Sequence, residues 1–240
     1  MLILDKTLNN IYNYDEWLEI TNTQGSAMLI NKESNWTSFD VIAKLRNIVK
    51  LKKIGHCGTL DPFATGLLIL CLGKGTKQIS TFQNLPKQYY ATIKLGATTK
   101  SFDIEQKEEN IKDITGITEN QIQDALNKFV GTIEQIPPMF SAKKINGERL
   151  YELARKDMEL ELKPVQVDIY SIELQKIELP FISILIDCSK GTYIRALARD
   201  IGSYLGVGAY LTQLCRTKIG DYSYSNAFTV NEIKEHNLFS

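Results

Sequence analysis

The sequence predicts an α+β protein built on a central mixed, mostly antiparallel sheet flanked by helices and loops. Segments with the apolar pattern of strands interleave with segments in which apolar residues recur at helical spacing. Two strand-like segments, 165–174 and 181–186, lie close enough along the chain to pair as a hairpin. Because hairpin neighbours run antiparallel, these patterns favour an α+β arrangement over a parallel α/β fold.

Composition is that of an ordinary globular chain. Its 240 residues suffice for one large or two small domains with a sizeable core, and 43% are hydrophobic while 23% are charged. No apolar run approaches the roughly 18 residues of a membrane span, and the N-terminus turns polar too soon for a signal peptide. The four cysteines form no C-x-x-C pair, so we expect reduced thiols and a cytoplasmic protein. With two histidines in the chain, a histidine-built metal site is not expected.

Charge is unevenly distributed although the formal net charge is zero. Lysine and arginine dominate 41–60 and 188–220, whereas acidic residues collect between 103 and 124. The basic stretches could form one face toward nucleic-acid phosphates, or they could be two ordinary solvated faces. Charge alone does not decide between these readings.

The first third of the chain begins with a polar segment, 1–25, which we expect to be a loosely packed arm anchored by Trp17 and Ile20. Thr37-Ser-Phe-Asp40 has the form of a helix start, followed by apolar residues at helical spacing. The elements expected here are a strand at 27–30, a helix at 37–49, a buried strand at 67–72 and a short helix at 76–83.

The remaining elements follow from similar signals, including a capping box at Thr118-Glu-Asn-Gln121 and a helix cap at Thr229. In the helix expected at 193–205, Arg195 and Arg199 lie on a different face from the apolar stripe. The other expectations are a strand at 88–95, a charged surface loop at 100–117, a strand at 131–136, a basic loop at 141–147, a helical turn or two at 149–156 and a last strand at 211–219.

The stretch from Ile54 to Gly66 is the strongest candidate for chemistry. Pro62 biases Asp61 toward an extended or turn conformation, and the surrounding glycines would let a ligand or a second backbone approach closely. The apolar run that follows is the length of a buried strand, so Asp61 should lie on a stiff loop just before it. That position suits a catalytic acid, base or nucleophile. The alternative is a simple Asp-Pro turn punctuated by glycines.

Four ordered segments resemble the motifs of the bacterial TruB-type tRNA pseudouridine-55 synthases, over about residues 27–237. They are Gly55-His-Cys-Gly-Thr-Leu-Asp-Pro-Phe-Ala-Thr-Gly-Leu67, Lys87-Gln-Tyr89 with Leu95-Gly96, Ile136-Pro-Pro-Met-Phe-Ser-Ala142 with Leu150-Tyr-Glu-Leu-Ala-Arg155, and Cys188-Ser-Lys-Gly-Thr-Tyr-Ile-Arg195. Glu33 departs from a usual proline, Phe140 from a tyrosine, and Gln106 from a glycine. The chain also stops where many family members continue into an RNA-binding PUA domain, so we expect that domain to be absent.

The resemblance implies a role for each site residue. The implied catalytic set is Asp61, Arg195 and Tyr89, and the implied substrate-binding set is His56, Tyr193, Leu214, Lys32 and Asp103. Arg195 would pair with Asp61 and keep it ionised, Tyr89 would stack on the uracil, and His56 would fill the space that the flipped uridine leaves. Without the family, Tyr89 and Leu214 would be read as core residues and Arg195 as a surface arginine.

The resemblance further implies isomerisation of uridine to pseudouridine in the T-loop of tRNA, with base flipping, and with no cofactor or metal. The implied organisation is an arm at 1–25 and a catalytic domain at 26–240, with a tRNA-gripping thumb at about 137–160. The expected partner is the T-arm stem-loop of tRNA. The protein is expected to act as a monomer and not to associate with a membrane.

Two other functions stay open at this point. The first is a non-enzymatic RNA-binding or RNA-folding module, which intact Asp61, Tyr89 and Arg195 argue against. The second is a nucleotidyl-transfer enzyme, which would want a second histidine nearby or a phosphate-loop lysine. An assay for pseudouridine after incubation with unmodified tRNA separates all three.

Overall fold

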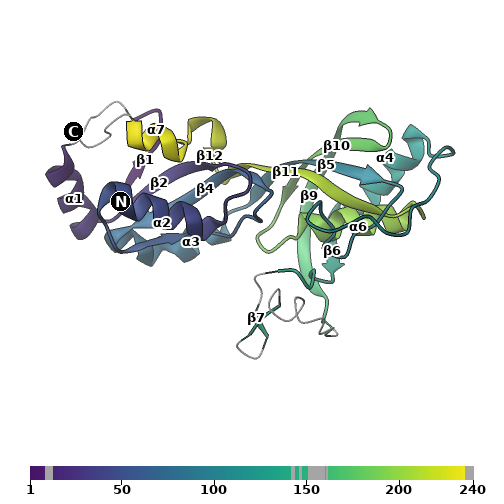
Figure 1. Cartoon of the computed structure of the whole chain (residues 1–240), viewed down its shortest axis with the longest axis horizontal. Helices are drawn as coiled ribbons and strands as arrows, with labels where there is room; N and C mark the ends of the chain where they lie inside the picture. Colours follow the sequence, from purple (N-terminus) through teal and green to yellow (C-terminus); the bar gives the residue numbers. More distant parts are fainter. Residues whose placement is uncertain (9–12, 142–143, 146–147, 151–159, 161, 236–240) are drawn as a thin grey trace. The chain divides into compact units, whose positions relative to one another are not determined.

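The computed structural model describes residues 1–8, 13–141, 144–145, 148–150, 160 and 162–235 (Figure 1). The chain forms two compact units: unit 1 comprises residues 1–88 and 215–240, and unit 2 comprises residues 89–214. Two strands, β5 (Lys87–Leu95) and β11 (Ala209–Ile219), run from one unit into the other. Unit 2 is therefore an insertion within unit 1 along the chain. The α+β class predicted from the sequence is confirmed.

Unit 1 is built around the buried strand β4. Its neighbours run in the order β1-β2-β4-β11; β2 pairs antiparallel to β4, and the end of β11 pairs parallel to the start of β4. The short β3 pairs antiparallel to the other end of β4. The strands are β1 (Leu2–Leu4), β2 (Ser26–Lys32), β3 (Ile54–His56), β4 (Thr65–Leu72) and β12 (Tyr222–Ser223). The helices are α1 (Tyr14–Thr23), α2 (Ser38–Val49), the 3-10 turns η1 (Gly73–Gln78) and η2 (Tyr224–Asn226), α3 (Ile79–Asn84) and α7 (Val230–Glu235).

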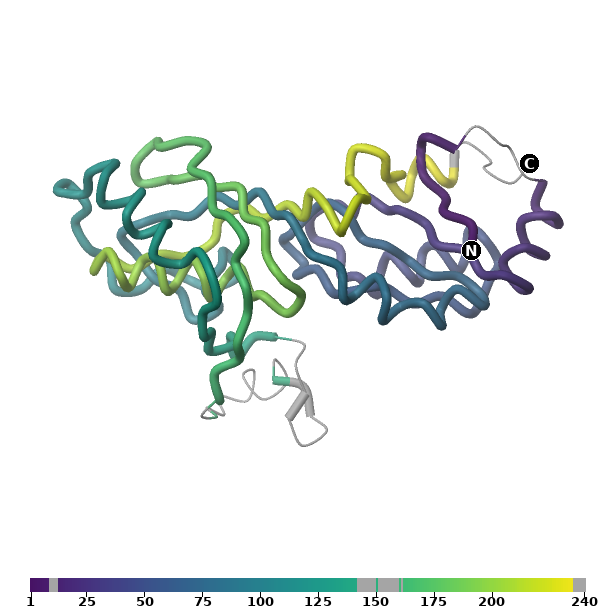
Figure 2. Tube along the Cα trace, turned by 180° about the vertical axis from the view of Figure 1, so that it is seen from behind, coloured from purple at the N-terminus to yellow at the C-terminus, as the bar shows by residue number. Residues whose placement is uncertain are grey.

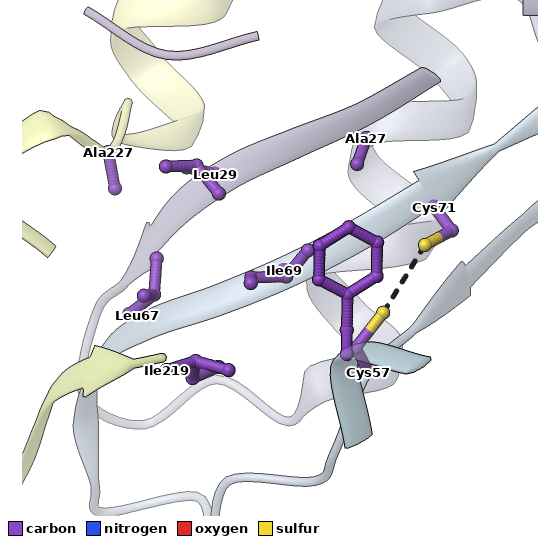
Figure 3. Packing of buried hydrophobic residues seen from close by; sticks show 9 residues of the cluster. Ala27, Leu29, Cys57, Leu67, Ile69, Cys71, Ile219 and Ala227 are labelled. Atoms are coloured by element: carbon purple, nitrogen blue, oxygen red, sulfur yellow. Dashed lines mark hydrogen bonds between the residues drawn. The ribbon is translucent and has the colours of Figure 1, made fainter. Parts of the chain in front are cut away.

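One core cluster of unit 1 joins β2 and β4 to residues from near the end of the chain. Leu29, Leu67 and Ile69 pack with Ile219 and Ala227 (Figure 3). In the same cluster the side chains of Cys57 and Cys71 point toward each other, with 3.3 Å between their sulfurs. All four cysteines are free thiols, as the sequence predicted.

The expectation of a loosely packed arm at residues 1–25 is wrong. Leu2–Leu4 forms a parallel strand beside β2, and the N–H of Lys6 donates to the Asn226 carbonyl at 2.8 Å. Helix α1 begins with a capping box at Asn13, and the Trp17 side chain is completely buried. The prediction that Trp17 anchors this segment is confirmed, whereas the polar residues around it gave no sign of an ordered helix.

Unit 2 continues the sheet in the order β11-β5-β10-β9-β6. The predicted hairpin is confirmed as β9 (Val165–Glu178) and β10 (Phe181–Cys188), drawn in green in Figure 2, and β6 (Gly131–Gln135) pairs antiparallel to β9. Its helices are α4 (Glu119–Lys128), opened by the predicted capping box at Thr118, and α6 (Ile194–Tyr204). The two-residue strands β7 (Lys144–Ile145) and β8 (Glu148–Arg149) pair antiparallel.

Other expectations need correction. The segment 100–117 has no helix or named strand, yet it is not wholly a surface loop, because Ser101 and Asp103 are completely buried. Arg195, expected on a face apart from the apolar stripe, is itself buried. The strand ending at Ile219 is not the last, because β12 follows it. Most of the helical turn expected at 149–156, and most of the expected thumb, lie outside the described residues.

Candidate active site

Asp61 lies, half-buried, in the turn that connects β3 to β4. Buried side chains at Leu60 and Phe63 anchor the turn on both sides of it, and the N–H of Ala64 donates to the Asp61 carbonyl at 3.1 Å. The Leu60 N–H also donates to the Ser38 hydroxyl of α2 at 3.0 Å. The prediction of a fixed loop directly before a buried strand is confirmed.

Lys32, at the end of β2, holds this loop from the interior. Its completely buried ammonium donates to the carbonyls of Glu33 at 3.0 Å, Trp36 at 2.7 Å and Pro62 at 3.1 Å. Burial lowers the pKa of Lys32 to about 8, and the charge of Asp61 opposes that lowering. Because Coulomb attraction acts on both partners, Lys32 also favours the ionised carboxylate of Asp61.

Arg216 is a second buried cation under the Asp61 loop. Its guanidinium donates to the carbonyls of Leu67 at 2.8 Å, Gly58 at 3.1 Å and Thr59 at 3.4 Å, and 2% of the residue is exposed. A Cβ on Gly66, whose φ is +96°, would lie 2.4 Å from the Arg216 carbonyl, so the close approach of a second backbone predicted for these glycines is found here. Arg216 therefore braces the loop on both sides of Asp61.

The position of Arg216 corrects its sequence interpretation. The charge pattern placed it in a basic stretch available to phosphates, whereas the structure buries it against carbonyl oxygens. Burying an arginine is costly unless its donors are bonded, and here they reach two loop carbonyls and the Leu67 carbonyl of β4. Its place inside a predicted strand, instead of in a loop, was the signal that could have identified it.

His56, the last residue of β3, is half-buried beside Phe39 of α2. The two ring centroids lie 5.4 Å apart with the planes at 87°. The Nδ1 atom of His56 is buried and has no hydrogen-bond partner within the described part of the chain. Burial and the neighbouring Arg216 lower the pKa of His56, so its imidazole is neutral near pH 7.

In unit 2, Arg195 of α6 is the centre of a buried polar cluster. Its guanidinium donates to Asp103 Oδ2 at 3.0 Å, to the Ser101 carbonyl at 3.1 Å and to the Phe140 carbonyl at 2.6 Å. Asp103 also accepts from the Ser101 hydroxyl and from the Glu105 N–H. Sequence reasoning included Asp103 but not this ion pair. The charge of an expected surface segment gave no sign that one carboxylate turns inward.

The other predicted site residues of unit 2 lie on the strands and helix already described. Tyr89 on β5 and Leu214 on β11 are buried, and Tyr193 precedes α6. The Tyr193 backbone is fixed by the Gln135 side-chain amide through bonds of 3.0 and 3.3 Å. Asp61 belongs to unit 1, so its pairing with Arg195 stays a prediction, as does the shared pocket with Tyr89.

The described residues contain neither a membrane-spanning helix nor a cluster of metal-ligating side chains. None of the helices that the structure describes is both long and apolar enough to cross a membrane. Nor do three or more histidine, cysteine or acidic side chains gather into a possible metal site anywhere in the described ranges.

The fold is that of the pseudouridine synthases. A solved H/ACA ribonucleoprotein bound to a substrate RNA containing 2′-deoxyuridine matches with a TM-score of 0.69 and 25% identity, over 95% of this chain and 58% of the solved chain. A Cbf5-Nop10-Gar1 complex matches with the same TM-score and 26% identity, over 95% of this chain and 62% of the solved one. The chain thus spans about three-fifths of these solved chains.

The chain belongs to the TruB family of tRNA pseudouridine synthases. The model of the TruB family pseudouridylate synthase N-terminal domain matches residues 46–194, and that of the tRNA pseudouridylate synthase B C-terminal domain matches residues 195–240. The tRNA pseudouridine synthase B of Parabacteroides distasonis is 49% identical over 88% of this chain and 92% of its own length. That of Bacteroides fragilis is 51% identical over 82% and 88%.

Proposed function

We propose that this chain converts uridine 55 in the T-loop of tRNA to pseudouridine, with Asp61 as the essential group. The observation that carries the proposal is the way in which buried cations fix the loop bearing the Asp61 carboxylate. Asp61 is half-buried on a turn whose carbonyls are bonded by two buried cations, Lys32 and Arg216, and the Lys32 charge favours its ionised form. Such an arrangement presents a fixed carboxylate oxygen in the ionised form that the proposed chemistry needs.

The proposed reaction is an isomerisation that conserves every atom of the uridine. The N1–C1′ bond breaks, the uracil rotates, and a C5–C1′ bond forms; C5 loses its proton and N1 gains one. Asp61 takes part either by adding covalently to the nucleoside or by removing a ribose proton, which would give a glycal intermediate. Both routes need the carboxylate form, and Arg195 is proposed to contribute the second positive charge.

A uridine within a folded loop is shielded by its neighbours, so the proposed mechanism includes flipping it out at a cost of a few kcal/mol. Stacking on Tyr89 would return about 1–3 kcal/mol of that cost. His56 would fill the space left in the RNA, while Tyr193 and Leu214 would line the uracil pocket. Exposed lysines of the stretch 41–60, together with the thumb, would bind the phosphates of the T-arm. We propose that the enzyme acts as a monomer and without a metal.

The test uses an unmodified tRNA transcript labelled with tritium at C5 of its uridines. Pseudouridine formation releases the C5 tritium to water, so release measures turnover directly. We expect release of one tritium for each tRNA with the intact protein, and none when uridine 55 is replaced by cytidine. Release from a different uridine would contradict the assignment of position 55.

The matched variant is Asp61→Asn, which keeps the shape of the side chain and removes its charge. Turnover should be abolished while tRNA affinity is largely retained, because phosphate contacts and stacking supply the binding. Residual turnover above about a tenth of wild type, 1.4 kcal/mol of barrier, would show that Asp61 is not the essential group. Absence of any release by the wild-type protein would leave a non-catalytic RNA-binding role instead.

A further inference from the structure

Phe39 is an aromatic residue to which the proposed function gives no role. It lies in the first turn of α2, and 57% of it is exposed. Its ring meets the His56 ring nearly at a right angle, with 5.4 Å between the centroids. The two rings thus form one continuous aromatic surface in unit 1. His56, one of the two residues, precedes Asp61 by five residues along the chain.

The backbone under Phe39 is fixed to the Asp61 loop. Thr37 and Asp40 form a capping box that sets the start of α2. Between them Ser38 accepts a hydrogen bond from the Leu60 N–H at 3.0 Å. Lys32 joins the same two segments by donating to the carbonyls of Trp36 and Pro62. Phe39 therefore keeps a constant position relative to the loop, as a contact made during recognition requires.

The His56 ring is suited to stacking more than to charge pairing. Its pKa is lowered by burial and by Arg216, so the ring is neutral. A proton on the buried Nδ1 would be a donor without a partner in the described part of the chain, which is costly, so the proton belongs on Nε2. A neutral imidazole in contact with an exposed phenyl ring offers aromatic surface, not a cation.

We propose that Phe39 and His56 together form an aromatic step that stacks against a base of the RNA loop next to the flipped uridine. This inference rests on the proposed function. Exposed lysines at 44, 50, 52 and 53 lie on α2 and just after it, and no acidic residue occurs in 41–60. An exposed aromatic ring on a helix that is also followed by exposed lysines matches a nucleic-acid strand, whose bases stack while its phosphates bind the lysines.

The test measures binding and turnover of an isolated T-arm stem-loop with position-39 variants. Phe39→Ala should weaken binding and lower kcat/KM roughly 5- to 150-fold, mainly through KM, the range expected for one lost base stack. Phe39→Trp should stay close to wild type, and Phe39→Leu should fall between the two. Tyr170→Ala is the matched control, because Tyr170 is also 57% exposed but belongs to unit 2, and it should leave both quantities unchanged.

A stem-loop with 2-aminopurine beside the target uridine identifies the contact. Stacking should quench its fluorescence on binding to the Asp61→Asn protein, and adding Phe39→Ala should reduce that quenching. Unchanged affinity and quenching in Phe39→Ala would overturn the inference. A loss confined to kcat would do so too, because it would mean that Phe39 only orients His56. If the wild-type protein makes no pseudouridine, the proposed function fails, while the binding and quenching measurements still decide whether Phe39 contacts a base.

Discussion

The two units stabilise their buried cations in different ways. In unit 1, Lys32 and Arg216 donate to main-chain carbonyls around the Asp61 loop. In unit 2, Arg195 donates to two carbonyls and also forms an ion pair with the buried carboxylate of Asp103. Carbonyl dipoles solvate a charge without cancelling it, whereas a carboxylate neutralises it.

The difference indicates two roles for positive charge. In unit 1 the charge of Lys32 favours the ionised form of the half-buried Asp61, while Lys32 and Arg216 together fix the loop that carries it. We propose that Arg195 of unit 2 acts through its direction as well as its charge, because its planar fork is held in one orientation by Asp103 and Phe140. The first two of the following predictions test the two sides of this contrast, and the last two test how RNA is engaged.

The largest loss of activity among these predictions is expected when the orientation of the Arg195 guanidinium is lost. Arg195→Lys cannot reproduce the planar fork with which the guanidinium reaches its three acceptors, so kcat should fall about 100-fold or more, equivalent to about 2.7 kcal/mol of barrier. Asp103→Asn should produce a loss of the same order. The control is Lys176→Ala, which removes an exposed ion pair with Glu178 and should change little. Near wild-type turnover of Arg195→Lys would mean that a point charge is enough.

The second prediction concerns the charge of Lys32. Because its pKa in the folded protein is about 8, above that pH the ammonium becomes an amine with too few N–H donors for the three carbonyls that fix the Asp61 loop, and kcat should decline by up to about tenfold per pH unit. The unfolding free energy should change in the opposite direction. Between pH 8 and 10.5 the unfolded lysine holds a proton that the folded one lacks, so this residue's contribution to stability rises with pH. Denaturant unfolding and turnover, each measured across this pH range, check both signs.

A variant separates Lys32 from other groups that titrate in the same range. Lys32→Met should remove both the alkaline decline in kcat and the rise in stability, although the protein as a whole becomes less active. If the decline in kcat persists in Lys32→Met, a different group controls it, and the electrostatic role assigned to unit 1 is wrong.

A smaller effect is expected at Tyr89, where stacking is the proposed contribution. Tyr89→Ala should weaken engagement of the flipped base by about 1–3 kcal/mol, and Tyr89→Phe by less because the ring remains. Single-turnover rates with saturating tRNA measure the difference. If the phenylalanine variant is as inactive as the alanine variant, the hydroxyl takes part in proton transfer and the ring is not merely a platform.

The smallest effect is expected when whole tRNA is shortened to its T-arm stem-loop. A T-arm stem-loop should be nearly as good a substrate as whole tRNA, with kcat/KM within about tenfold, or 1.4 kcal/mol. Its affinity should fall with added salt, since phosphate contacts release counterions. A larger loss for the stem-loop would show that the chain, including residues 1–25, reads more of the tRNA than the T-arm.

Local rules recovered the local parts of this structure. The capping boxes at Thr37 and Thr118 and the hairpin of β9 and β10 were readable because their determinants lie within a few residues of one another. Asp61 was found because proline, glycines and a buried strand lie beside it. These signals were sufficient for the fold class and for the loop at the candidate site.

The contacts that hold the site were beyond such rules. Arg216 is 149 residues from its partner Leu67, and Arg195 is 92 residues from Asp103. No periodicity connects residues so far apart, and a charged side chain is normally expected at the surface. The packing of residues 1–25 escaped for the same reason, because β1 is a strand only through its pairing with β2.

The insertion of unit 2 within unit 1 sets an order of events during biosynthesis. The Asp61 loop is translated early, but Arg216, which binds the carbonyls of Gly58 and Thr59, follows it by 158 and 157 residues. At about 5–20 residues per second, the ribosome needs roughly 8–30 s to cover that gap. Unit 2 is complete before Arg216, Ile219 and Ala227 can join unit 1. A nascent chain halted before residue 215 therefore carries Asp61, the proposed catalytic residue, on a loop without its arginine brace.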